Sequence, residues 1–144
     1  MLITKKIHIH MGHRVPNHKS QCRNPHGHTY FIEVGVDDKV ISNPGESDDG
    51  MVIDFSDLKD IMMAKIDKNF DHAFVVYKGD KYMNFFDEMY KDGLKIVTVD
   101  VIPTAENLAK IWFEMLEQPL KVNGIKLHHV KVWETPSSTA TYSI

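Results

Sequence analysis

The sequence is poor in cysteine and contains no long hydrophobic run, and each absence excludes a class of protein. A single cysteine, Cys22, rules out an internal disulfide and any zinc ribbon built from several cysteines. No apolar stretch is long enough to cross a membrane, and the N-terminus has no signal-peptide pattern. We therefore expect a cytoplasmic protein that has no membrane partner.

Positive charge is not concentrated anywhere in the chain. The net charge is −3 with histidine neutral, and no basic stripe stands out, which argues against nucleic acid as a partner. With 42% hydrophobic and 26% charged residues, the composition is that of an ordinary globular protein. The 144 residues predict one domain, 1–144, large enough to bury a core without covalent staples. The unusual feature is the number of histidines, which is nine.

Hydrophobic periodicity predicts an α+β fold. A period of two residues predicts strands over 2–13, 28–36, 50–55, 95–101, 125–134 and 140–144. A period of 3.6 residues predicts helices over 54–70 and 103–117, and residues 77–94 are ambiguous, with a short helix around 84–90. Asp54 or Ser56 can cap the first helix, and Thr104 can cap the second. This order favours helices packed on one face of an antiparallel sheet.

Three histidines extend the apolar faces of the first two predicted strands. His13 has the parity of the buried positions in the first strand, and His26 and His28 have that of the second. If these strands pair antiparallel through the 14–25 loop, their ends meet and the three imidazoles come together. A His-x-His pair alone is more often a pair of exposed side chains that bind no metal, but a third histidine on the matching face of its strand favours a metal site. Three neutral imidazoles would leave one zinc position open.

Histidines of the other parity, and the lone cysteine, set limits on that site. His8 and His10 point away from the apolar face and are not expected to bind the metal. Cys22 lies in a polar loop, between Gln21 and Arg23, which is not the environment of a buried thiol. As a fourth zinc ligand it would close the coordination sphere and leave nothing for chemistry.

Two further clusters carry carboxylates. Asp71 precedes His72 directly; the commoner case for such a pair is a turn residue beside a chance neighbour, and the alternative is a carboxylate that orients an imidazole for proton transfer. Glu134 ends a strand on the parity of its apolar positions. It is either in a salt bridge or exposed beyond the strand end, or it accepts two parallel hydrogen bonds from the edge of a pterin or guanine.

In series, these motifs resemble one family. The series is His13, "CRNPHGH" at 22–28, Asp71-His72, "PTAENLA" at 103–109 and "WET" at 133–135. It resembles the 6-pyruvoyltetrahydropterin synthase family and, within it, the branch that makes 6-carboxytetrahydropterin. The resemblance covers nearly the whole chain. No single motif is decisive, but five in order are specific. Residues 77–100 look longer than in compact members.

The resemblance implies a tunnelling fold (T-fold): a four-stranded antiparallel sheet with two helices on one face, joined into β-barrels in a homo-oligomer that is commonly a hexamer. It also implies a Zn²⁺-dependent lyase whose small-molecule substrate is a pterin triphosphate, 7,8-dihydroneopterin triphosphate. The implied products are 6-carboxytetrahydropterin, acetaldehyde and triphosphate, made in queuosine or 7-deazapurine synthesis.

The resemblance also implies roles for single residues. Zinc would be held by His13, His26 and His28. Protons would be moved by the Cys22 thiolate and by a second relay, Asp71 with His72. Glu134 would anchor the pterin ring, with Thr104 and Glu106 near it. For the triphosphate, the loop offers Arg14, Lys19 and Arg23.

Two alternatives remain open in the sequence. A 6-pyruvoyltetrahydropterin synthase would keep the fold and the metal but eliminate triphosphate without breaking the carbon chain, so that no acetaldehyde would form. A non-catalytic domain stapled by zinc, which binds a pterin or only the metal, would instead use Cys22 to close the coordination sphere.

Overall fold

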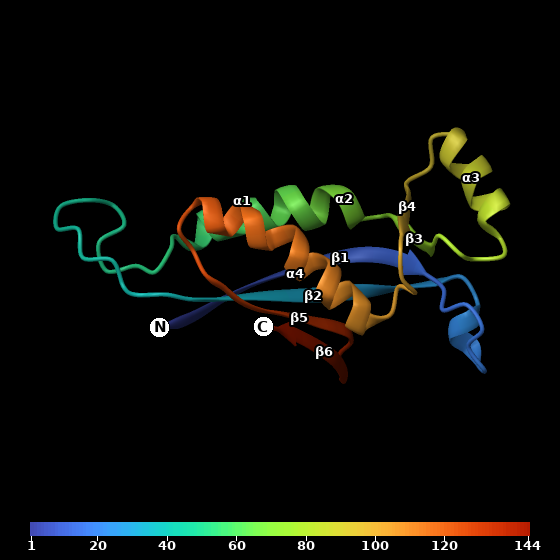
Figure 1. The fold of residues 1–144 in the computed structure, drawn as a ribbon, viewed down its shortest axis with the longest axis horizontal. Coiled ribbons are helices and arrows are strands. Elements are labelled where there is room, and N and C mark those ends of the chain that lie inside the picture. Colours follow the sequence, from blue (N-terminus) through green and yellow to red (C-terminus); the bar gives the residue numbers. More distant parts are fainter.

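A six-stranded sheet forms the centre of the computed structural model, which describes residues 1–144 (Figure 1). The strand order is β4-β3-β1-β2-β5-β6. Antiparallel pairing joins β1 (Leu2–His13), β2 (His26–Asp37), β5 (Leu127–Thr135) and β6 (Ser138–Ser143). The short strands β3 (Phe74–Tyr77) and β4 (Ile96–Val99) extend the sheet in parallel from β1. The predicted α+β fold is confirmed, with six strands in place of four.

Two helical segments cover one face of this sheet, as Figure 1 shows. The first runs without a break through α1 (Phe55–Met62), a π-helical turn η2 (Met63–Asp67) and α2 (Lys68–Phe70). The second is α4 (Ala105–Val122). Side chains cap both segments as predicted, since Asp54 accepts from the Ser56 amide and Thr104 accepts from the Asn107 amide. None of the helices combines the length and apolar character needed to cross a bilayer.

Two smaller elements lie outside this layer. The short helix expected near residues 84–90 is α3 (Met83–Lys91), which stands beyond the end of the sheet beside β3 and β4 in Figure 1. A single 3₁₀ turn, η1 (Gln21–Arg23), lies in the loop between β1 and β2. The strand predicted over 50–55 is wrong. Backbone bonds link Ile41 only to Gly50 and Met51, so this segment has too short a partner to form a ladder.

The core lies between the sheet and the two covering segments. It is one cluster of 23 buried apolar residues, to which the two strands contribute alternate residues, Ile7, Ile9 and Met11 of β1 and Tyr30, Ile32, Val34 and Val36 of β2. These two strands pair without a register shift from Leu2↔Asp37 to His13↔His26. Because side chains alternate along a strand, this register places the predicted histidines on the face that the helices cover.

Candidate functional site

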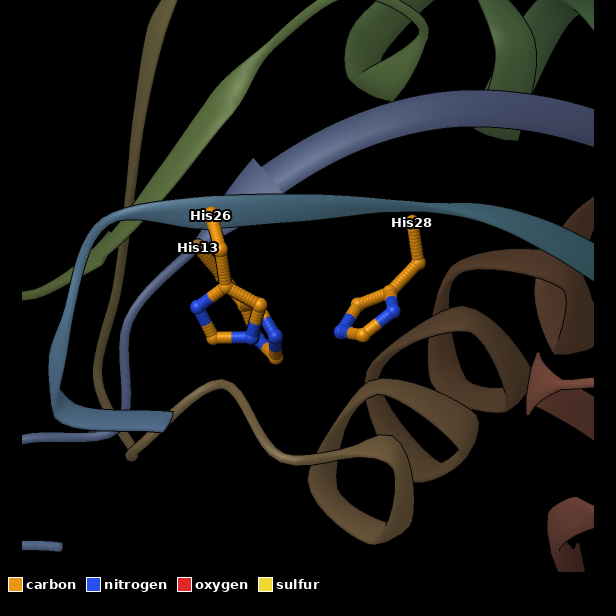
Figure 2. A group of neighbouring side chains, drawn as sticks. All are labelled: His13, His26 and His28. Carbon is orange, nitrogen blue, oxygen red and sulfur yellow. The ribbon is translucent and has the colours of Figure 1, made fainter. Parts of the chain in front are cut away.

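Three imidazoles meet at the end of the β1–β2 pair, on the core side of the sheet (Figure 2). The ring centroids of His13 and His26 are 4.7 Å apart, and the ring of His28 lies 5.2 Å from His13 and 5.0 Å from His26. One nitrogen from each ring lies within 4.8 Å of the other two. The structure therefore brings together the predicted ligand set. We call these three residues the histidine triad.

Hydrogen bonds to backbone carbonyls fix the tautomers of two triad members. The Nδ1 atom of His13 lies 2.7 Å from the Pro103 oxygen, and that of His26 lies 2.6 Å from the Asn24 oxygen. Because a carbonyl oxygen only accepts, both Nδ1 atoms carry the proton and donate it. Each Nε2 is left with a free lone pair, which is the arrangement that orients histidine as a metal ligand.

The third triad member carries an unpartnered buried nitrogen. His28 Nε2 is shielded from solvent and has no hydrogen-bond partner. The nearest carboxylate oxygen, Oε1 of Glu134, is 3.9 Å away, too far for a hydrogen bond. A buried nitrogen without a partner costs free energy that a bound cation would recover. The triad can therefore hold a metal ion that prefers imidazole, and Cys22 does not belong to the group of clustered ligand atoms.

Burial keeps the triad in the form that binds a metal. Loss of solvent lowers the pKa of His13 to about 4, against the weaker opposing effect of the hydrogen bond to Pro103. Loss of solvent also lowers the pKa of His28. The hydroxyl of Tyr30 lies 3.4 Å from both ring nitrogens of His13, and burial raises the pKa of this phenol. At pH 7 His13 and His28 are thus neutral imidazoles beside a neutral hydroxyl.

Four predicted catalytic and binding residues share a neighbouring hollow of about 230 Å³: Cys22, Thr104, Glu106 and Glu134. We call it the cysteine hollow. Thr104 and Glu106 are placed by the first turn of α4. Glu134 lies where the β5–β6 register shifts, between Trp133 and Thr135. Residues from the loop, the helix and the last two strands thus line one small volume.

A second hollow, of about 430 Å³, shares Glu134 with the first and also includes His28. It adds two aromatic residues that the sequence reasoning missed, Phe31 and Trp133. They are register partners on β2 and β5. The sequence holds a sign of Phe31, which is a large apolar residue on the face of its strand that points away from the core. Flat apolar side chains beside a carboxylate suit a planar heterocycle that has a polar edge.

Asp71 and His72 form the predicted pair, but they lie outside the cysteine hollow. His72 Nδ1 is 2.7 Å from one oxygen of Asp71, and the other oxygen accepts from the His10 amide at 2.9 Å. That backbone bond is the main reason why the pKa of Asp71 is lowered. The imidazole lines a shallow hollow over Gly12 and Gly27 that does not include Cys22. Within one chain, the two expected proton relays are therefore not in the same hollow.

Comparison with known proteins supports one family. The family model described as 6-pyruvoyl tetrahydropterin synthase matches residues 2–144. Curated relatives named 6-carboxy-5,6,7,8-tetrahydropterin synthase include one from Rickettsia bellii, 32% identical over 93% of this chain and 94% of the relative. Another, from Haemophilus influenzae, is 32% identical over 97% of this chain and 96% of the relative. A third, from Aquifex aeolicus, is 36% identical over 85% and 76%.

Solved structures share the fold. An uncharacterized protein from Wolinella succinogenes superposes with a TM-score of 0.82 at 22% identity, over 99% of this chain and 97% of the other. The 6-pyruvoyl tetrahydropterin synthase of Caenorhabditis elegans superposes with a TM-score of 0.69 at 26% identity, over 100% and 95%. The described arrangement of strands and helices is thus found across this group.

Proposed function

Because the chain belongs to the 6-pyruvoyl tetrahydropterin synthase family, we propose that it acts as a 6-carboxy-5,6,7,8-tetrahydropterin synthase. This lyase converts 7,8-dihydroneopterin triphosphate and water to 6-carboxytetrahydropterin, acetaldehyde and triphosphate, on a route to 7-deazapurines such as queuosine. The observation that carries the proposal is the similarity to relatives of that name over nearly the full length, combined with the histidine triad and with a hollow that holds Cys22 and Glu134.

The metal we propose is Zn²⁺, held by the Nε2 atoms of the histidine triad. Three neutral imidazoles with one open position are a common catalytic zinc set. When bound, the ion would supply Lewis acidity toward oxygen atoms of the substrate side chain. The backbone carbonyls of Pro103 and Asn24 would hold the two imidazoles that they orient.

The cysteine hollow would hold the reacting end of the substrate. Cys22 is half-buried and free, so its sulfur can take and return a proton at a carbon of the side chain. Glu134 can accept two parallel hydrogen bonds from the amide N–H and amino group of the pterin ring. Thr104 and Glu106, in the first turn of α4, line the same hollow and complete the polar contacts to the ring.

The position of Asp71 and His72 bears on assembly. Their hollow is separate from that of Cys22, and His72 is largely exposed, so a site that needs both relays is incomplete within one chain. We therefore place the complete site in a homo-oligomer, of the hexameric kind, in which one copy presents Asp71 and His72 toward the Cys22 of its neighbour. The outermost strand β6 has one unpaired edge, through which sheets can join into barrels.

Mass spectrometry of the products tests the reaction. Purified zinc-loaded protein supplied with 7,8-dihydroneopterin triphosphate should release acetaldehyde and 6-carboxytetrahydropterin in equal amounts. A 6-pyruvoyl product without acetaldehyde would instead identify the triphosphate-eliminating reaction.

Two further measurements test the assembly. Light scattering gives the number of copies in the oligomer. Mixing the inactive Cys22→Ala and His72→Ala variants should restore part of the activity if the two relays of one site come from different copies.

A further inference from the structure

One lysine outside the described hollows is attached to the Asp71–His72 pair. Lys95 lies directly before β4, in the segment 77–100 that looks longer than in compact members of the family. Its ammonium group donates to the carbonyl oxygen of Lys68 at 3.0 Å and to that of Asp71 at 2.5 Å. Lys95 forms no ion pair with a carboxylate. The side chain is therefore used to hold the backbone at the end of α2.

The end of α2 has an unusual backbone that such a cation can stabilise. The last carbonyl groups of a helix lack amide partners within the helix, and their dipoles favour a nearby positive charge. Glycine often follows a helix in the left-handed conformation, but here His72 adopts it, with a φ of 60°. A side chain beyond glycine is strained in this region, so surrounding contacts must hold it there.

The peptide group that joins Asp71 to His72 is held at both of its polar ends. Its N–H donates to the carbonyl oxygen of His10 in β1 at 2.6 Å, and its carbonyl oxygen accepts from the Lys95 ammonium. Lys95 is itself fixed, because its backbone carbonyl accepts from the Phe74 amide at 2.9 Å where the β3–β4 pairing begins. Rotation of the peptide group would change the φ of His72 and would break both of its contacts.

We propose that Lys95 is a positioning residue for the relay formed by Asp71 and His72. By holding their shared peptide group, it sets the direction in which the His72 imidazole leaves the backbone. Nδ1 of that imidazole stays 2.7 Å from Asp71, and the ring is otherwise largely exposed, so Nε2 faces outward. The inference rests on the proposed function, which gives the pair its part in proton transfer. It also assigns a role to the long segment 77–100.

Amide hydrogen exchange, measured by mass spectrometry on the zinc-loaded protein, tests the anchoring without any turnover. Lys95→Met removes the charge and keeps the length, so the His72 amide should exchange roughly tenfold faster after loss of one charge-assisted hydrogen bond. Lys95→Arg keeps a cation and should stay close to the unaltered protein. Lys91→Met, in the last turn of α3, is the matched control and should change nothing at His72. Equal exchange at His72 in Lys95→Met and the unaltered protein would overturn the inference.

Steady-state kinetics show whether Lys95 acts through His72. In Lys95→Met, kcat should fall roughly tenfold while KM and zinc content stay unchanged, because a misplaced imidazole transfers protons poorly but does not alter binding. In a His72→Ala background the same substitution should cause no further loss, and an equal loss in both backgrounds would contradict the positioning role. If the unaltered protein forms no product but exchange at His72 still depends on Lys95, the anchoring stands and only the proposed reaction fails.

Discussion

His13 donates a hydrogen bond from Nδ1 to the carbonyl oxygen of Pro103, 90 residues away in the chain, across 2.7 Å. This one contact joins the end of β1 to the turn that precedes α4. It orients the metal-binding nitrogen of His13, and it also fixes the start of the helix whose first turn lines the cysteine hollow. The metal centre and the substrate hollow are therefore positioned by the same hydrogen bond.

Replacing His28 should remove the metal. His28→Ala deletes a ligand from a set of three, and we expect zinc content to fall from about one per chain to a small fraction, with loss of product formation. His8→Ala is the matched control, since His8 is exposed and lies on the other face of the sheet. Metal analysis of the purified proteins decides this. Full zinc occupancy in His28→Ala would contradict the assignment.

Replacing Cys22 should separate chemistry from metal binding. The thiol is not part of the clustered ligand atoms, so Cys22→Ala should keep its zinc and its melting temperature. Product formation should fall by roughly two to four orders of magnitude, as is typical when a general acid or base is removed. Steady-state rates and metal content are measured on the same preparation. Loss of zinc together with activity would show instead that the cysteine is a ligand.

Glu134 should govern the affinity for the pterin ring. Glu134→Gln keeps the size but turns one acceptor into a donor that faces a donor, which costs about 2 kcal/mol or roughly thirtyfold in binding. Because substrate and transition state make the same contact, the rate at saturation should change less than KM does. Glu114→Gln, on the exposed side of α4, should leave both unchanged. Unchanged pterin affinity in the Glu134 variant would place the ring elsewhere.

The metal-free protein should lose stability in mild acid. The pKa of His13 is about 4 in the folded protein, against 6.5 for an unperturbed histidine. The unfolded chain therefore binds more protons than the folded chain between these pH values. The free energy of unfolding should therefore fall as the pH drops from about 6.5 to about 4, by about 3 kcal/mol in all. Urea unfolding at pH 7 and pH 5 measures this. In His13→Gln the pH dependence should be smaller, and an unchanged dependence would exclude His13 as its source.

The sequence predicted the parts of the fold that local periodicity controls. Alternation in β1 and β2 and the stripe of α4 are strong signals, and the shared parity of the histidine triad followed from them. The strand β4 was predicted within 95–101, but β3 was missed, because it has only four residues and forms through long-range parallel pairing. A strand was also predicted over 50–55, where the apolar residue Val52 is buried in the core without any strand partner.

The candidate site also contains residues whose positions follow from local patterns and contacts that depend on long-range packing. Glu134, on a strand parity, and Thr104, at a helix cap, line the same hollow as Cys22, while their roles stay predictions. His72 and Cys22 line different hollows because of how the end of α2 packs against the sheet. Local sequence patterns do not predict such long-range packing. The pairing of Arg14 with Asp80 joins residues 66 apart, and it determines which cations of the loop remain available.

The unbroken register between β1 and β2 has an evolutionary consequence. A one-residue insertion or deletion in the middle of either strand would place the apolar side chains on one side of the change and the triad ligands on the other side on opposite faces of the sheet. Such a change would therefore cost the chain either its metal centre or part of its buried core. Relatives with other activities should therefore differ by point substitutions at the triad and by the lengths of their loops. Insertions in a loop leave the strand pairing intact.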